Sequence, residues 1–252
     1  MIMDFILPYA AKWFLVFLRA GIVIMLLPFL GSTMIPAQVK IGLAAAVAVV
    51  LAPVVPAPGP LAPAPALVLR EVLFGIAIGS AARFVFIAVE AAGQMISGAM
   101  GLSLATAFNP DIGQSTEAAR LLGMIAMLLF LATDSHHDLI VLFARSYELA
   151  PALRIDAAFL TKAATEWGGR LFVLTVKLSA PIVVASLLTN LLLGFLARTA
   201  PQLNVFFVGY PVYLFVGFLL LLTGMPVFIH ETTASFATVR DGLLRIMAGM
   251  GR

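Results

Sequence analysis

The chain has 252 residues, of which 62% are hydrophobic and 11% are charged, and its mean hydropathy is +1.10. Soluble domains carry about 25% charged residues, so this composition excludes a water-soluble globular protein, whose surface would need more charges. The net charge is +3 and there is no cysteine, which excludes disulfides and thiolate metal sites and gives no indication of a nucleic-acid partner. We therefore expect one integral membrane domain over residues 1–252, in contact with the lipid bilayer.

The first quarter of the chain contains two apolar segments. The first, Trp13–Gly31, carries a single charge at Arg19, and the second, Ile41–Val55, carries none. A run of prolines then begins, and because such a run cannot remain helical, we expect an extended connection there. Its prolines are Pro53, Pro56, Pro58, Pro60, Pro63 and Pro65.

The next predicted helix begins at Arg70 and ends at Glu90, with Arg83 inside it. The following segment, Ala91–Phe108, is uncharged and rich in glycine and serine. Small residues at helical spacing let neighbouring backbones approach closely in a membrane. We therefore expect this segment to pack against other helices.

A polar break at Asn109–Glu117 follows. It begins Asn-Pro-Asp-Ile-Gly, and asparagine, proline, aspartate and glycine are the residues that favour turns. On residue types alone, this stretch is an ordinary solvated loop between two apolar helices.

Two short apolar pieces, Leu121–Thr133 and Leu139–Ala144, flank the polar sequence Asp134–Asp138. Neither piece can cross a bilayer alone, because a crossing helix needs about 20 apolar residues. We predict a buried hairpin of two short helices with the polar sequence at its tip. Helices of this length need protein neighbours to cover their irregular backbone.

The remaining chain contains two long uncharged runs, Leu178–Ala197 and Val205–Ile229, which are interrupted by Pro181, Pro211 and Pro226. The stretch before them, from Arg145 to Lys177, is the most polar in the chain. After Glu231 the tail is mildly basic, with apolar residues at helical spacing. We find no internal repeat at a fixed period, which argues against a transporter built from repeats.

The sequence Asp134-Ser135-His136-His137-Asp138 has the densest group of titratable side chains. Histidine and aspartate are costly inside a membrane, so a metal site or a proton relay is one interpretation. Metal ligands on one helix face normally lie three or four residues apart, as Asp134 and Asp138 do, but His230 is the only other histidine in the chain. The chain also lacks the common catalytic motifs. We therefore favour a polar tip and predict no metal, no cofactor and no enzymatic activity.

Three arginines interrupt apolar sequence: Arg19, Arg83 and Arg198. An arginine at the centre of a membrane helix costs about 2.5–3.5 kcal/mol. Each side chain must therefore either extend to the membrane interface or pair, and the expected pairing is with an acidic group or a helix C-terminus of a partner subunit. The residues alone leave both interpretations open.

Four blocks of sequence, in order, resemble one known family. They are Ile35-Pro36 with residues 39–43; Ala92-Gly93-Gln94 with residues 100–110; residues 129–136 with Ser146-Tyr147 and Pro151; and Asn190–Gly194 with Arg198, residues 200–205 and Gly209. The family is FliR/SctT, the export-gate subunits of flagellar and type III secretion systems. Asp134-Ser135 differs from the Asn/Asp-Gly that the family has before this histidine, so the conformation of the tip stays open.

The resemblance implies an all-α membrane protein, in which kinked helices and helical hairpins pack into a hetero-oligomeric export gate. The gate lies in the bacterial inner membrane, within a flagellar or injectisome basal body. FliP-like and FliQ-like subunits complete it, an FlhB-like switch protein is a further partner, and unfolded secreted proteins pass through its centre.

The resemblance also assigns roles to residues. It implies that the loop from Thr106 to Glu117 contributes to a plug that closes the pore, and Met95 and Met100 would pack beside it. The plug residues are Phe108, Asn109, Pro110, Asp111, Ile112, Gly113, Gln114 and Ser115. Outside the plug, the residues expected to make subunit contacts or to form a polar knot are Arg83, Asp134, His136, Arg198, Pro201, Gln202 and Asn204.

Two other functions use the same residues differently. In a secondary transporter or permease, Asp134, His136 and Arg198 would line a substrate path. In an intramembrane enzyme, His136 would take part in catalysis. The missing repeat and the short helices argue against the transporter, and we expect a gate that opens by displacing its plug, without covalent chemistry.

Overall fold

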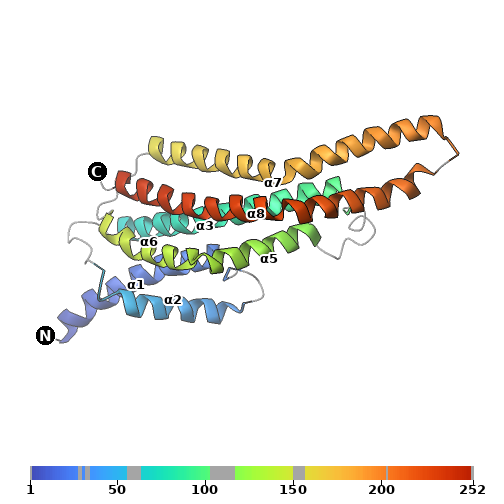
Figure 1. The fold of residues 1–252 in the computed structure, drawn as a ribbon. Coiled ribbons are helices and arrows are strands. Elements are labelled where there is room, and N and C mark those ends of the chain that lie inside the picture. Colours follow the sequence, from blue (N-terminus) through green and yellow to red (C-terminus); the bar gives the residue numbers. More distant parts are fainter. Residues whose placement is uncertain are drawn as a thin grey trace. The chain divides into compact units, whose positions relative to one another are not determined.

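A computed structural model describes residues 2–27, 30–31, 35–55, 64–102, 117–149, 157–202 and 204–250. Most of these residues lie in helices, and they include no strand (Figure 1). The helices are α1 (Ile2–Leu26), α2 (Ala37–Leu51), α3 (Ala64–Ala99), α5 (Glu117–Ala132), α6 (Ser135–Leu149), α7 (Ala157–Thr199) and α8 (Val205–Met250). The predicted all-α class is confirmed.

Among the described residues, four helices contain a stretch that is long and apolar enough to cross a membrane. These stretches are Tyr9–Leu26 in α1, Leu67–Ala99 in α3, Ala164–Thr199 in α7 and Phe207–Arg245 in α8. The pair α5 and α6 can form a fifth span with a break inside it, whereas α2 has only 15 residues. The prediction of an integral membrane protein is confirmed.

Helix α3 is longer than the sequence suggested. One helix of 36 residues, which ends at Ala99, contains the predicted segment Arg70–Glu90 and residues 91–99 of the predicted segment Ala91–Phe108. The helix also includes Pro65, which we expected in the extended connection. Proline is tolerated there because backbone N–H groups in the first turn have no partner within the helix.

The predicted hairpin tip at Asp134–Asp138 is wrong. Only Thr133 and Asp134 lie between α5 and α6, and residues 135–138 form the first turn of α6. Asp134 has a φ of 55°, a left-handed conformation that aspartate tolerates better than most residues. This one residue makes the break, so no loop of five residues is needed.

A helical hairpin does occur, between α7 and α8. Lys177 pairs with Glu231, the Tyr213 hydroxyl donates to Asn190 Oδ1, and Gly209 lies beside Leu193. The later a residue lies in α7, the earlier its partner lies in α8. The two helices are therefore antiparallel. Helix α8 continues through Glu231 to Met250, so the basic tail is not a separate element. Pro181, Pro211 and Pro226 all lie inside these helices.

Two compact units share the long helices. Unit 1 comprises residues 1–84, 134–167 and 236–252, and unit 2 comprises residues 85–133 and 168–235. In unit 2, α3 contacts α5 through Phe86 and Phe130, whose ring centroids are 5.6 Å apart. It contacts α7 through the Thr175 hydroxyl, which donates to the Ala88 carbonyl at 3.2 Å. In unit 1, the Phe84 ring of α3 stacks on the Trp167 ring of α7.

Candidate functional site

The predicted plug loop, Phe108–Ser115, lies outside the described residues. The structure does define where the chain leaves α3. The Gly101 N–H donates to the Gly98 carbonyl, and the Leu102 N–H donates to the Ser97 carbonyl at 2.9 Å. With Gly101 at a φ of 74°, this is a Schellman helix cap, in which glycine supplies the left-handed residue. The helix therefore stops at a fixed point before the predicted loop.

The helices on either side of this loop are in close contact in unit 2. A Cβ atom built on Gly93 of α3 would lie 2.4 Å from Cα of Ala119 in α5. Only a glycine permits that approach, because the neighbour is backbone that cannot rotate away. The loop's two ends are thus attached to helices that are held together.

The predicted packing residues Met95 and Met100 differ in environment. Met100 is buried, and a Cβ atom built on Gly217 of α8 would lie 2.4 Å from its Cγ. Met95 is exposed, and its sulfur lies 3.5 Å from the Ser179 hydroxyl of α7. The sequence analysis did not identify Gly217, although glycine in an apolar helix is the usual signal of a close helix contact.

The polar residues predicted as subunit contacts lie at the surface of the chain. Arg83 on α3 is exposed, as is Arg198 in the last turn of α7. Pro201 and Gln202 form an exposed turn after α7. Asn204 directly precedes α8, and its carbonyl and side-chain oxygens both accept the Phe207 N–H, as is typical of an N-cap.

Unit 1 contains a buried charged cluster whose residues the sequence did not reveal as neighbours. The Arg19 guanidinium of α1 donates from Nε to Glu71 Oε2 of α3 at 2.6 Å and from Nη1 to Ser146 Oγ of α6 at 2.6 Å. Its Cζ lies 3.7 Å from the ring centroid of Tyr147 and 4.9 Å from that of Phe74. The Arg19 and Glu71 side chains are 1% and 0% exposed, so the pair is closed to substrates and joins three helices.

Arg70 contributes to the same cluster. Its Nε and Nη2 atoms both donate to Glu71 Oε1, at 3.1 and 2.9 Å. The Glu71 carboxylate is therefore held between two arginines. Of the two open interpretations of Arg19, pairing is confirmed, but the acidic partner belongs to the same chain.

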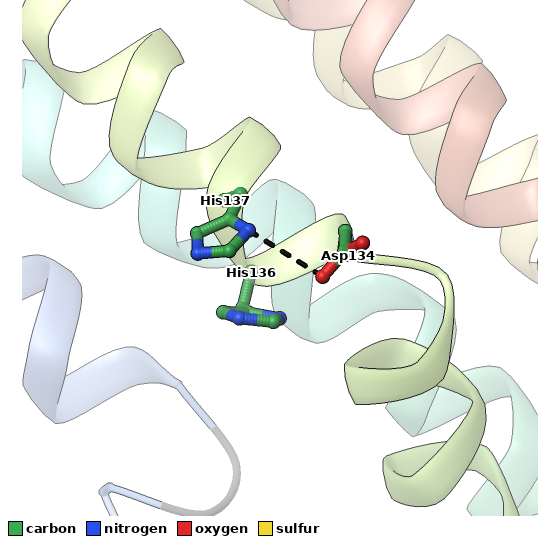
Figure 2. A group of neighbouring side chains, drawn as sticks. All are labelled: Asp134, His136 and His137. Atoms are coloured by element: carbon green, nitrogen blue, oxygen red, sulfur yellow. Dashed lines mark ion pairs between the residues drawn. The ribbon is translucent and has the colours of Figure 1, made fainter.

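The polar first turn of α6 brings Asp134, His136 and His137 together, as Figure 2 shows. Asp134 Oδ1 lies 3.4 Å from His137 Nδ1, and the two imidazole ring centroids are 4.2 Å apart. Asp138 points to a different partner, since its Oδ2 lies 3.2 Å from Nη1 of Arg240 near the end of α8. Arg198, Pro201, Gln202 and Asn204 belong to unit 2 and are not part of this group.

Comparisons with known proteins identify a family. The model of the family described as "Bacterial export proteins, family 1" matches residues 10–239. The chain is 37% identical to the flagellar biosynthetic protein FliR of Caulobacter vibrioides over 217 residues, which cover 82% of this chain and 85% of the relative. It is 36% identical to FliR of Escherichia coli over 228 residues, covering 87% and 86%. It is also 33% identical to the secretion system apparatus protein SsaT of Salmonella typhimurium over 170 residues, covering 66% and 65%.

Proposed function

Because this chain belongs to the family of bacterial export proteins, family 1, we propose that it helps to form and gate a pore through which a flagellar or type III apparatus exports unfolded proteins. The observation that carries this function is the family match over residues 10–239, together with relatives named for both flagellar biosynthesis and a secretion apparatus. The same match favours a component of an export apparatus over the alternative of a secondary transporter or permease. It also favours a structural or transport role over an enzymatic one.

We propose that the segment Phe108–Ser115 is the plug of this pore. The support comes from its attachment. The preceding helix ends in a glycine cap at Gly101, and α3 and α5 are in contact at Gly93 and Ala119. A loop held at both ends by packed helices is suited to a functional role, because a rigid scaffold positions it. Opening would displace the loop and would require no covalent chemistry.

We further propose that the partners are FliP-like and FliQ-like subunits and an FlhB-like switch protein, in the bacterial inner membrane. The apolar surface supports the need for such partners. In an 18-residue apolar window of α8, only 11% of the residues are buried within the chain, and in such a window of α7 28% are buried. Exposed apolar surface on this scale must be covered by lipid or by other subunits.

Removing the plug tests the proposal in an assembled export complex. We expect deletion of Asn109–Gln114 to raise the ion permeability of cells or vesicles that contain the complex, because nothing else is proposed to close the resting pore. The measurement is the rate of ion leak with no substrate in transit.

The matched control replaces Asn109–Gln114 with six glycine and serine residues, which keeps the length of the connection but removes its side chains. A leak from the deletion alone would assign the seal to loop length, and a leak from both variants would assign it to these side chains. An unchanged leak in both variants, with the complex intact on native gels, would reject the plug.

A further inference from the structure

The start of α6 places three metal-binding side chains within reach of one ion. One ligand atom from each of Asp134, His136 and His137 lies within 4.8 Å of the other two (Figure 2). The distance between Asp134 Oδ1 and His137 Nδ1 is already 3.4 Å. Two ligands bound at about 2.0–2.1 Å to one tetrahedral ion lie about 3.3 Å apart. This pair therefore has the separation that a shared ion requires.

The backbone explains how such closely spaced residues converge. Ligands that lie on one helix face are three or four residues apart, which Asp134 and His137 are, whereas His136 directly precedes His137. Asp134, however, precedes the helix, in a left-handed conformation with a φ of 55°. Its carbonyl accepts the N–H groups of His137 and Asp138, at 2.9 and 3.2 Å. This holds Asp134 against the first turn, so its carboxylate returns to the side of His137.

We propose that Asp134, His136 and His137 bind one divalent cation of the class of Zn²⁺, Ni²⁺ or Cu²⁺. Two imidazole nitrogens and one carboxylate oxygen are a ligand set that these ions accept, whereas Mg²⁺ and Ca²⁺ prefer oxygen ligands alone. The Asp134 and His137 side chains are 74% and 68% exposed, so water can complete the coordination shell. The site goes beyond the proposed export function and does not depend on it.

The charges around the site favour moderate affinity. Asp138 does not add a second carboxylate to the group, because it pairs with Arg240 at 3.2 Å. One carboxylate and two neutral imidazoles leave a net charge of +1 on the complex with a divalent ion. The role that follows is structural: the ion would tie Asp134, which lies before α6, to two residues of the first turn and so fix the left-handed start of the helix.

The test uses the full chain in its purified export complex, carried on an affinity tag that contains no histidine. The complex is stripped with a chelator, dialysed and titrated with Zn²⁺ alone, and the bound metal is counted per copy of the chain. We expect the wild-type complex to bind one Zn²⁺ more than complexes carrying His137→Asn or the double change His136→Asn and His137→Asn. The variant His230→Asn, which removes the third histidine of the chain, should bind as much as wild type.

A second measurement protects the test against misfolding. Asp134→Asn keeps a residue that tolerates the left-handed conformation but removes the charged ligand, so we expect an intact complex that binds Zn²⁺ at least tenfold more weakly. Co²⁺ loaded into the wild-type site should show the visible absorption of a protein-bound ion. This absorption should be absent in both histidine variants. Equal Zn²⁺ binding by wild type, Asp134→Asn and His137→Asn would overturn the site, while leaving the export function untouched.

Discussion

In the cluster around Arg19, removing one partner of the ion pair with Glu71 is expected to have a large effect on the stability of the protein. Removing one partner of a buried ion pair leaves an uncompensated charge and typically costs about 3–5 kcal/mol. The two partners are not equivalent here, because Glu71 would keep Arg70 if Arg19 were lost. Arg19 would keep only the Ser146 hydroxyl and two aromatic rings if Glu71 were lost.

This asymmetry gives an ordered prediction. We expect Glu71→Leu to lower the unfolding midpoint of the purified protein more than Arg19→Met does, and the double variant to recover part of the loss from Glu71→Leu. Thermal unfolding in detergent checks the order. The control is Arg240→Gln, which breaks an exposed pair and should cost no more than about 1 kcal/mol. A double variant that is less stable than both single variants would contradict a buried ion pair.

The same residues show what the sequence could predict. Arg19 stood out because it interrupts an apolar segment, and pairing was one of two expected outcomes. Its partner could not be identified, because Glu71 is 52 positions away and appeared as the polar start of a helix. Likewise, the sequence around Asp134 indicated a break between helices. It did not indicate the left-handed φ of Asp134, which lets residues 135–138 form the first turn of α6 in place of a loop.

At the scale of elements, glycine positions decide how closely helices approach. Gly93 and Gly98 both lie on α3, yet only Gly93 contacts another helix. The sequence analysis predicted close packing for this stretch from its small residues but could not say which glycine makes the contact. Gly93 and Gly98 differ in their neighbours in the folded structure, which the composition does not show.

We expect Gly93→Ala to destabilise the protein by about 1–3 kcal/mol, the usual cost of overpacking. The added methyl group would meet the Ala119 backbone at 2.4 Å, so α3 and α5 would have to move apart. Gly98→Ala is the matched control, because no atom of the described residues lies within 4 Å of its built Cβ and alanine is the better helix former. Unfolding midpoints of both variants check this, and equal midpoints would show that the helices separate without cost.

At the scale of the whole molecule, the exposed apolar surface must contact either lipid or partner subunits. In 18-residue apolar windows, 56% of the α3 residues are buried within the chain, against 28% for α7 and 11% for α8. The surface is therefore concentrated on the α7 and α8 hairpin, where Leu192 and Phe215 are among the exposed large side chains. The composition predicted that apolar surface would be exposed, but only the structure shows which helices carry it.

Contact with lipid and contact with partner subunits predict different behaviour on purification. We expect that partner subunits contact this surface. If lipid alone covered the hairpin, the chain would be stable by itself, as a permease would be. If other subunits cover it, the chain should purify in a fixed ratio with different small membrane proteins and should be degraded when it is produced alone. Photo-crosslinking residues at Leu192 and Phe215 should then form adducts with another protein, and one at buried Ile182 on α7 should not. Adducts with lipid only at both exposed positions, from a chain that survives alone, would contradict the gate assembly, because no partner would touch the surface that most needs one.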